Sequence, residues 1–180
     1  MMAGTRNLSD YPDLSTPRLS LRRLATRDAA AIVRIVGQWD VARRLARVPH
    51  PYTPDDARFF LEQVAPQEWI WAITRTGADA LIGVIGLTPD KRDDRAELGY
   101  WLDPDQWGGG LMTEAGQAVL SHAFGPFGLS VVTSSYFEDN PASGRVLAKL
   151  GFMETARTMR PCLAMGRDVP SVEVQQPRRA

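Results

Sequence analysis

Three consecutive glycines, Gly108 to Gly110, separate a segment with the pattern of a strand from a segment with the pattern of a helix. Residues 96–103 (AELGYWLD) precede them, and residues 111–124 follow with apolar side chains at helical spacing. Glycine lets a backbone approach a ligand closely, and the first N–H groups of a helix have no partner within it. The turn therefore predicts a phosphate or diphosphate site, although a tight connection without a ligand would use the same glycines.

Two familiar phosphate motifs do not fit this turn. It is not a P-loop, because no Gly-Lys-Ser/Thr ends it, and a Rossmann fingerprint fits poorly because the turn follows the fourth predicted strand with the wrong spacing.

The chain has 180 residues, 44% of them hydrophobic, which suits one globular domain. Its 21 basic and 21 acidic residues give a formal net charge of zero, which argues against a nucleic-acid partner. We expect a monomer or homodimer.

Cys162 is the only cysteine, so no internal disulfide can form, and we expect a small buried side chain there. The two histidines, His50 and His122, lie far apart and show no metal-binding spacing, so we expect no metal. Residues 1–10 have no apolar core typical of a signal peptide, and no apolar run approaches the ~18 residues of a membrane span. These features predict a cytoplasmic protein without a membrane partner.

Local patterns predict the other elements. We expect strands over 18–24, 68–75, 80–88, 130–137, near 152–158 and over 170–175, and helices over 27–37, 53–64 and 141–150. The strand–helix–strand crossover through residues 96–137 implies one parallel pair in an otherwise antiparallel sheet. We therefore predict a single α/β (α+β) domain over residues 1–180. It has a mixed, mostly antiparallel twisted sheet of six to seven strands, helices on both faces, and frayed ends at 1–10 and 176–180.

Four pieces of the chain together resemble the GNAT superfamily of acetyltransferases, and most closely its branch of Rim-type ribosomal-protein N-terminal acetyltransferases. The resemblance covers roughly residues 15–158. The pieces are Ala96–Leu102 with Trp107–Ala115, Asn140–Ser143 with Lys149–Phe152, Thr16–Leu19, and Pro49–Thr53. The resemblance implies an N-acetyltransferase that uses acetyl-CoA as co-substrate. The alternative is a catalytically silent CoA-binding or interaction module on the same fold.

The resemblance also implies a cofactor site. The strands at 96–103 and 130–137 would splay apart, and the pantetheine arm would enter between them and pair with strand backbone. The residues expected to bind the cofactor are Tyr100, Trp101, Leu102, Trp107, Gly108, Gly109, Gly110, Leu111, Met112, Thr113, Asn140 and Ser143. The sequence departs from the superfamily at Trp107, where Gln or Arg is common, and at Met112, whose side chain we expect to narrow the cradle.

Two residues are candidates for proton transfer. Glu97 lies on the strand beside the expected thioester site, where the superfamily often keeps an acid, and could act as a base through water. It could equally be a surface residue paired with Arg95 or Arg92. Ser143 is the candidate acid, because Leu147 stands where many GNAT enzymes have a tyrosine. A serine in a first helical turn can also simply bond to the backbone.

The acceptor is expected to be a primary amine, either a protein N-terminal α-amine or a small-molecule amine. An α-amino group has a reference pKa of ~7.7–8.0, against ~10.4 for lysine, so it needs little help to lose its proton. We expect the acceptor between the first two helices and the C-terminal strands, where His50 and Tyr52 would face it. Alternatively, the prolines around His50 only stiffen an exposed loop.

Overall fold

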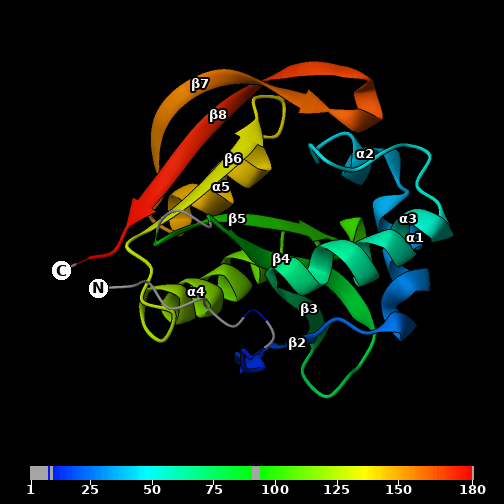
Figure 1. Ribbon diagram of the computed structural model, residues 1–180, viewed down its shortest axis with the longest axis horizontal. Coiled ribbons are helices and arrows are strands. Elements are labelled where there is room, and N and C mark those ends of the chain that lie inside the picture. The colour runs from blue at the N-terminus through cyan, green and yellow to red at the C-terminus, as the bar shows by residue number, and fades with distance from the viewer. Residues whose placement is uncertain (1–7, 9, 91–93, 180) are drawn as a thin grey trace.

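A single mixed sheet runs through the chain (Figure 1). The computed structural model describes residues 8, 10–90 and 94–179. Within these residues, eight strands lie in the order β1-β2-β3-β4-β5-β6-β8-β7, and β5 with β6 is the one parallel pair among them. They are β1 (Leu14–Ser15), β2 (Leu19–Arg23), β3 (Trp69–Arg75), β4 (Leu81–Pro89), β5 (Arg95–Leu102), β6 (Val131–Phe137), β7 (Met153–Cys162) and β8 (Arg167–Pro177). The predicted fold class is confirmed, and the two-residue β1 is the additional strand.

Helices cover both faces of this sheet, as predicted. The α-helices are α1 (Ala29–Val36), α2 (Trp39–Ala42), α3 (Pro54–Phe59), α4 (Leu111–Phe124) and α5 (Pro141–Lys149). The short turns are η1 (Thr26–Asp28), the π-helical η2 (Phe60–Val64), η3 (Ala65–Gln67), η4 (Pro104–Gln106) and η5 (Leu163–Met165). The helix expected over 53–64 is therefore α-helical only to Phe59 and continues as a π-helical turn.

The two faces bury separate apolar clusters because side chains alternate along each strand. On β3, Trp69 and Trp71 pack with α4 and α5, whereas Ile70 and Ala72 pack with α1 and α3. The two tryptophans are almost fully buried, and large aromatic side chains of this kind contribute much of the apolar area of a core. Figure 1 shows α4 on one side of the sheet and α1 with α3 on the other, with the β7–β8 hairpin arching over the top.

Capping residues fix the start of two helices as the sequence predicts. The Thr53 hydroxyl accepts a hydrogen bond from the Asp56 N–H, and the Asp56 carboxylate accepts one from the Thr53 N–H at 2.8 Å. The Asn140 side chain accepts a hydrogen bond from the Ser143 N–H at 3.3 Å. Both helices continue with a proline at the first helical position, where no N–H partner is needed.

The C-terminal end is more ordered than the sequence suggested. Residues 176 and 177 were expected to fray, but Gln176 pairs with Val132 and Pro177 with Val131, so β8 runs the full length of β6. The Arg178 N–H then donates to Ser130 O at 2.7 Å. The expected fraying of residues 1–10 concerns positions that, apart from 8 and 10, lie outside the described residues, as do residues 91–93 of the predicted loop. Within the described chain, no helix is long and apolar enough to cross a membrane.

Candidate active site

The parallel strands β5 and β6 part after three residue pairs. Their pairing joins Arg95 to Val131, Ala96 to Val132 and Glu97 to Thr133, and then stops. The buried Ser134 hydroxyl donates to Leu98 O at 2.8 Å, so a side chain replaces the next backbone donor. Among the described residues, none pairs with β5 on its β6 side beyond Leu98, which leaves an edge that another extended chain can join.

The glycine turn lies where this open edge ends. Gly108 and Gly110 have positive φ angles of 79° and 75°, and Gly110 is the N-cap of α4. A Cβ at Gly108 would meet no atom within 4 Å, and at Gly109 the nearest atom would be 3.9 Å away. The turn thus presents bare backbone beside the first N–H groups of a 14-residue helix. Met112 is buried in the core, so the expectation that it narrows this cradle is wrong.

Trp107, the first residue of the turn, holds it to the end of β5. Its indole Nε1 donates to Leu102 O at 2.8 Å, while 43% of the residue stays exposed. The Arg44 guanidinium lies over the indole ring, 4.9 Å from the centroid. Its Nε is buried and has no partner among the described residues, whereas the neighbouring Arg43 pairs with Asp139 at 2.9 Å. Arg44 therefore brings a cation to the turn from the loop after α2.

Two hydroxyl groups meet across the opening between the strands. The Tyr100 hydroxyl of β5 lies 2.7 Å from Ser143 Oγ in the first turn of α5. Burial raises the pKa of Tyr100 to about 12, an effect that its hydrogen bond with Ser143 only partly offsets. Tyr100 therefore stays protonated at neutral pH. Leu147 lies on the same helix, at the position where a tyrosine acid would be expected, and its apolar side chain is buried in the core.

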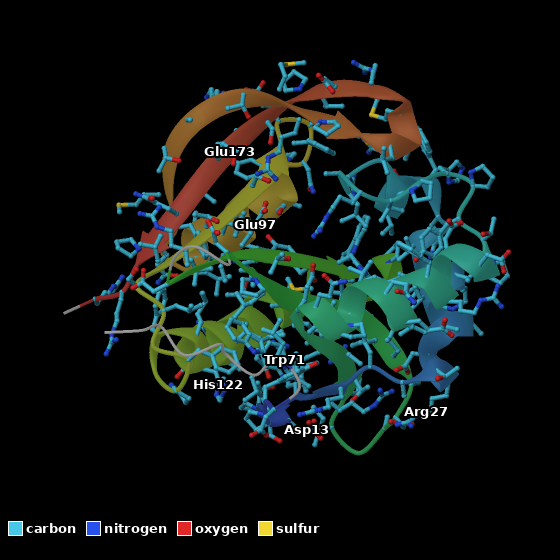
Figure 2. All side chains as sticks on the ribbon, in the orientation of Figure 1. Asp13, Arg27, Trp71, Glu97, His122 and Glu173 are labelled. Atoms are coloured by element: carbon cyan, nitrogen blue, oxygen red, sulfur yellow. The ribbon has the colours of Figure 1, made fainter. Side chains whose placement is uncertain are left out.

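Glu97 belongs to an ion-paired cluster at the base of the opening. Arg160 of β7 contacts Glu97 Oε1 at 2.7 Å and Glu173 Oε1 of β8 at 2.8 Å. The ion pair that the described residues show for Glu97 is thus with Arg160, because the β7–β8 hairpin folds back over β5. Arg92, one of the two expected partners, lies outside the described residues. Figure 2 shows Glu97 beneath this hairpin and Glu173 on its strand β8. A cavity of about 320 Å³ opens beside Glu97 and is also lined by Thr88 and Thr133.

The two residues expected to face the acceptor lie on the α1–α3 side of the sheet. His50 is exposed, with its ring at 64° to that of Trp39 and 5.1 Å away between centroids. Tyr52 is half-buried against the cluster around α1 and α3. Burial, with a smaller contribution from Asp56, raises the pKa of Tyr52 to about 12. The loop after α2 also meets the tip of the β7–β8 hairpin, where the buried Cys162 packs.

In the described structure, most but not all of the residues predicted to form the site lie around one opening. The unpaired edge of β5, the glycine turn and Ser143 surround one opening, while His50 and Tyr52 lie further out on the α1–α3 side. Sequence reasoning missed Arg44 and Arg160. An unpaired strand edge beside an uncovered helix N-terminus suits a ligand with an extended amide arm and a phosphate group.

The comparisons with known proteins agree with this class of site. Residues 18–153 match the family model described as "Acetyltransferase (GNAT) domain". The chain is 33% identical over 150 residues to the uncharacterized N-acetyltransferase YoaA of Bacillus subtilis, covering 80% of this chain and 84% of that one. The protein belongs to the GNAT family of acetyltransferases, whose members use acetyl-CoA.

Two solved structures share the fold. The ribosomal-protein-S5-alanine acetyltransferase from Vibrio fischeri has a TM-score of 0.79 and 18% identity, over 93% of this chain and 97% of that one. The Mycobacterium smegmatis RimJ, solved in complex with CoA-disulfide, has a TM-score of 0.74 and 22% identity, over 92% and 86%. At these levels of identity, both likenesses show the shared fold.

Proposed function

We propose that this protein moves an acetyl group from acetyl-CoA to the free α-amine at the N-terminus of a peptide or protein. The observation that carries the proposal is the unpaired edge of β5 next to the uncovered turn Gly108–Gly110. A CoA ester needs both features, because its pantetheine arm carries amides and its diphosphate carries negative charge. A turn that served only to connect β5 to α4 would not require β6 to separate from β5.

The residues that would hold the co-substrate are those around this opening. Backbone groups of Tyr100, Trp101 and Leu102 would pair with the pantetheine amides, with Leu102 O excluded because it already accepts from Trp107. The diphosphate would bind the N–H groups of the turn and of the first helical residues, including Gly108, Gly109, Gly110, Leu111, Met112 and Thr113. Asn140 would act indirectly, by fixing the start of α5 and hence Ser143.

Acetyl-CoA supplies a thioester from which the amine displaces a thiolate. We assign Glu97 the role of accepting, through water, the proton that the attacking nitrogen loses. Ser143 donates a hydrogen bond and then a proton toward the departing sulfur. Arg160 holds Glu97 in place, since its guanidinium contacts both Glu97 and Glu173.

The acceptor follows from the charges on the α1–α3 side of the opening. Glu97 and Glu173 both pair with Arg160, so these three side chains together carry a net negative charge that favours a cationic amine. An α-amine loses its proton near neutral pH and needs only a weak base, whereas a lysine amine needs a strong one. His50 and Tyr52 would contact the residues that follow the acceptor amine. The name of the Vibrio fischeri neighbour, a ribosomal-protein acetyltransferase, supports the same acceptor class.

An acceptor panel tests this proposal through release of the CoA thiol. We expect release with peptides that have a free N-terminus. The same peptides with a blocked N-terminus and an internal lysine should give at least ~10-fold less, because their amine is largely protonated at pH 7. Polyamines and aminoglycosides complete the panel.

Two outcomes would overturn the proposal. Thiol release with polyamines or aminoglycosides but not with peptides would show that the acceptor class is wrong. Binding of acetyl-CoA without release of thiol across the whole panel would instead support a catalytically silent CoA-binding module on the same fold.

A further inference from the structure

An acidic residue stands beside the turn that we assign to the diphosphate. Glu114 lies in the first turn of α4, where a carboxylate stabilises the positive end of a helix. An ionised carboxylate at this end would also compete with a bound diphosphate for the same positive potential and would repel it. A helix that only needed its own N-terminus stabilised would gain from Glu114, but a helix that binds an anion would lose affinity.

The structure pairs this carboxylate with a cation and neutralises it. Thr16 Oγ1 donates to Glu114 Oε1 at 2.6 Å, and the Arg18 N–H donates to the same oxygen at 2.9 Å. Arg18 Nε donates to Glu114 Oε2 at 2.6 Å. Both carboxylate oxygens are thus occupied by the segment before β2, which lies 96 residues earlier in the chain.

Arg18 also holds the glycine turn itself. Its Nη1 donates to Gly109 O at 2.9 Å, which fixes that carbonyl toward the guanidinium. Its Nη2 lies 3.7 Å from the position that a Cβ on Gly110 would take, so the cation sits beside the N-cap of α4. One side chain therefore compensates the charge of Glu114 and orients a peptide group of the turn.

We propose that Thr16 and Arg18 are positioning residues for the diphosphate of acetyl-CoA, which they serve by neutralising Glu114 and by fixing the turn at Gly109. This inference rests on the proposed function of the turn. It gives a role to the Thr16–Leu19 segment, which lies far from the turn in the sequence.

The protonation state of Glu114 supports this role. Burial raises the pKa of its carboxyl, but the hydrogen bonds from Thr16 and Arg18, together with the Arg18 charge, outweigh burial and leave the pKa below its ordinary value. The carboxylate is therefore fully ionised at neutral pH, and its charge has to be balanced. Arg18 is 49% exposed at its side chain, and an exposed ion pair adds little to stability. Its contribution to anion binding can therefore be separated from folding.

The test is a double-mutant cycle measured by calorimetric titration with acetyl-CoA, which needs no acceptor. Arg18→Ala should weaken binding about tenfold, or ~1.4 kcal/mol, because it leaves Glu114 uncompensated. Glu114→Gln in the Arg18→Ala background should restore a large part of that loss, since the repelling charge is removed. Arg58→Ala is the matched control: Arg58 is an exposed arginine on α3 that pairs with Asp55, and its loss should leave binding unchanged.

Kinetics separates positioning from general damage to the fold. Arg18→Ala should raise the KM for acetyl-CoA by a similar factor while kcat at saturation stays the same, and Arg18→Lys should recover part of the loss. If Arg18→Ala binds acetyl-CoA as tightly as the unmodified protein, or if Glu114→Gln restores nothing, the inference is wrong. If the unmodified protein does not bind acetyl-CoA at all, the proposed function itself has failed.

Discussion

At the scale of single residues, the hydroxyl pair of Ser143 and Tyr100 allows a specific test of the proposed acid. Ser143→Ala should lower kcat by about 10²-fold, the usual size of an acid–base contribution, with little change in the KM for acetyl-CoA. Tyr100→Phe should have a smaller effect, because it removes only the partner that orients Ser143. Steady-state thiol release measures both.

The buried Ser171 provides the control for this experiment. Its hydroxyl also bonds to a neighbour, donating to Tyr136 O at 3.2 Å, but it lies on β8, which is not adjacent to the β5 strand of Tyr100. Ser171→Ala should cost about 1 kcal/mol of stability and leave kcat unchanged. An unchanged kcat in Ser143→Ala would remove Ser143 from the mechanism and leave it as a residue of the first helical turn.

Sequence patterns could locate these residues but not their partners. Glu97 and Ser143 were singled out because they lie in recognisable local motifs. Their contacts come from segments far away in the chain: Arg160 is 63 residues from Glu97, and Tyr100 is 43 residues from Ser143. Tyr100 was expected to contribute backbone alone, since no periodicity reveals which side chain spans an opening between strands. Such pairs depend on how β7, β8 and α5 pack onto β5, which local chemistry does not determine.

At the scale of the elements, two neighbouring glycines of the turn before α4, Gly109 and Gly110, are expected to be required for different reasons. Gly110 has a φ of 75°, where an alanine is strained, so Gly110→Ala should lower the free energy of unfolding by about 1–2 kcal/mol. Gly109 is not among the glycines with positive φ, and a Cβ there would meet its nearest atom at 3.9 Å. Gly109→Ala should therefore change stability by less than ~0.5 kcal/mol. Urea unfolding measures both.

The same pair distinguishes a ligand cradle from a plain turn. Gly109→Ala adds a methyl group to the open side of the turn, so it should weaken acetyl-CoA binding despite its normal stability. Equal destabilisation by both substitutions would mean that strain at φ is not what requires glycine at position 110.

Elements with strong local signals were predictable, and those without were not. The α4 helix was expected over 111–124 and has those bounds, because a glycine turn starts it and an apolar stripe runs along it. The α5 helix follows from the Asn140 cap and the proline after it. By contrast, β7 was expected near 152–158 but extends to Cys162. Almost all of its residues are exposed, so it has no apolar alternation, and its length is set by pairing with β8.

At the scale of the whole molecule, the sheet consists of two parts whose strands pair with each other at β5 and β6. One part, β1 to β5, packs with α1, α3 and α4, the other, β6 to β8, packs with α5, and one apolar cluster under α4 and α5 runs across both. Three residue pairs join them at one end of the opening. At the other end, Leu163 donates its N–H to Ala46 O at 3.1 Å beside the buried Cys162. A ligand between β5 and β6 would touch both parts and tie them together.

This arrangement predicts that acetyl-CoA stabilises both parts of the molecule at once. At a ligand concentration of about 100 times Kd, linkage adds ~2.7 kcal/mol to the free energy of unfolding. For a chain of this size that corresponds to a rise in Tm of roughly 5–10 °C. Hydrogen exchange should slow at the start of α4, in the first part, and at the start of α5, in the second. Exposed amides of α3, which lies away from the opening, serve as the internal control.

Protection confined to α4 would mean that the ligand rests on the glycine turn without entering between the strands. In that case the parting of β5 and β6 would need another explanation.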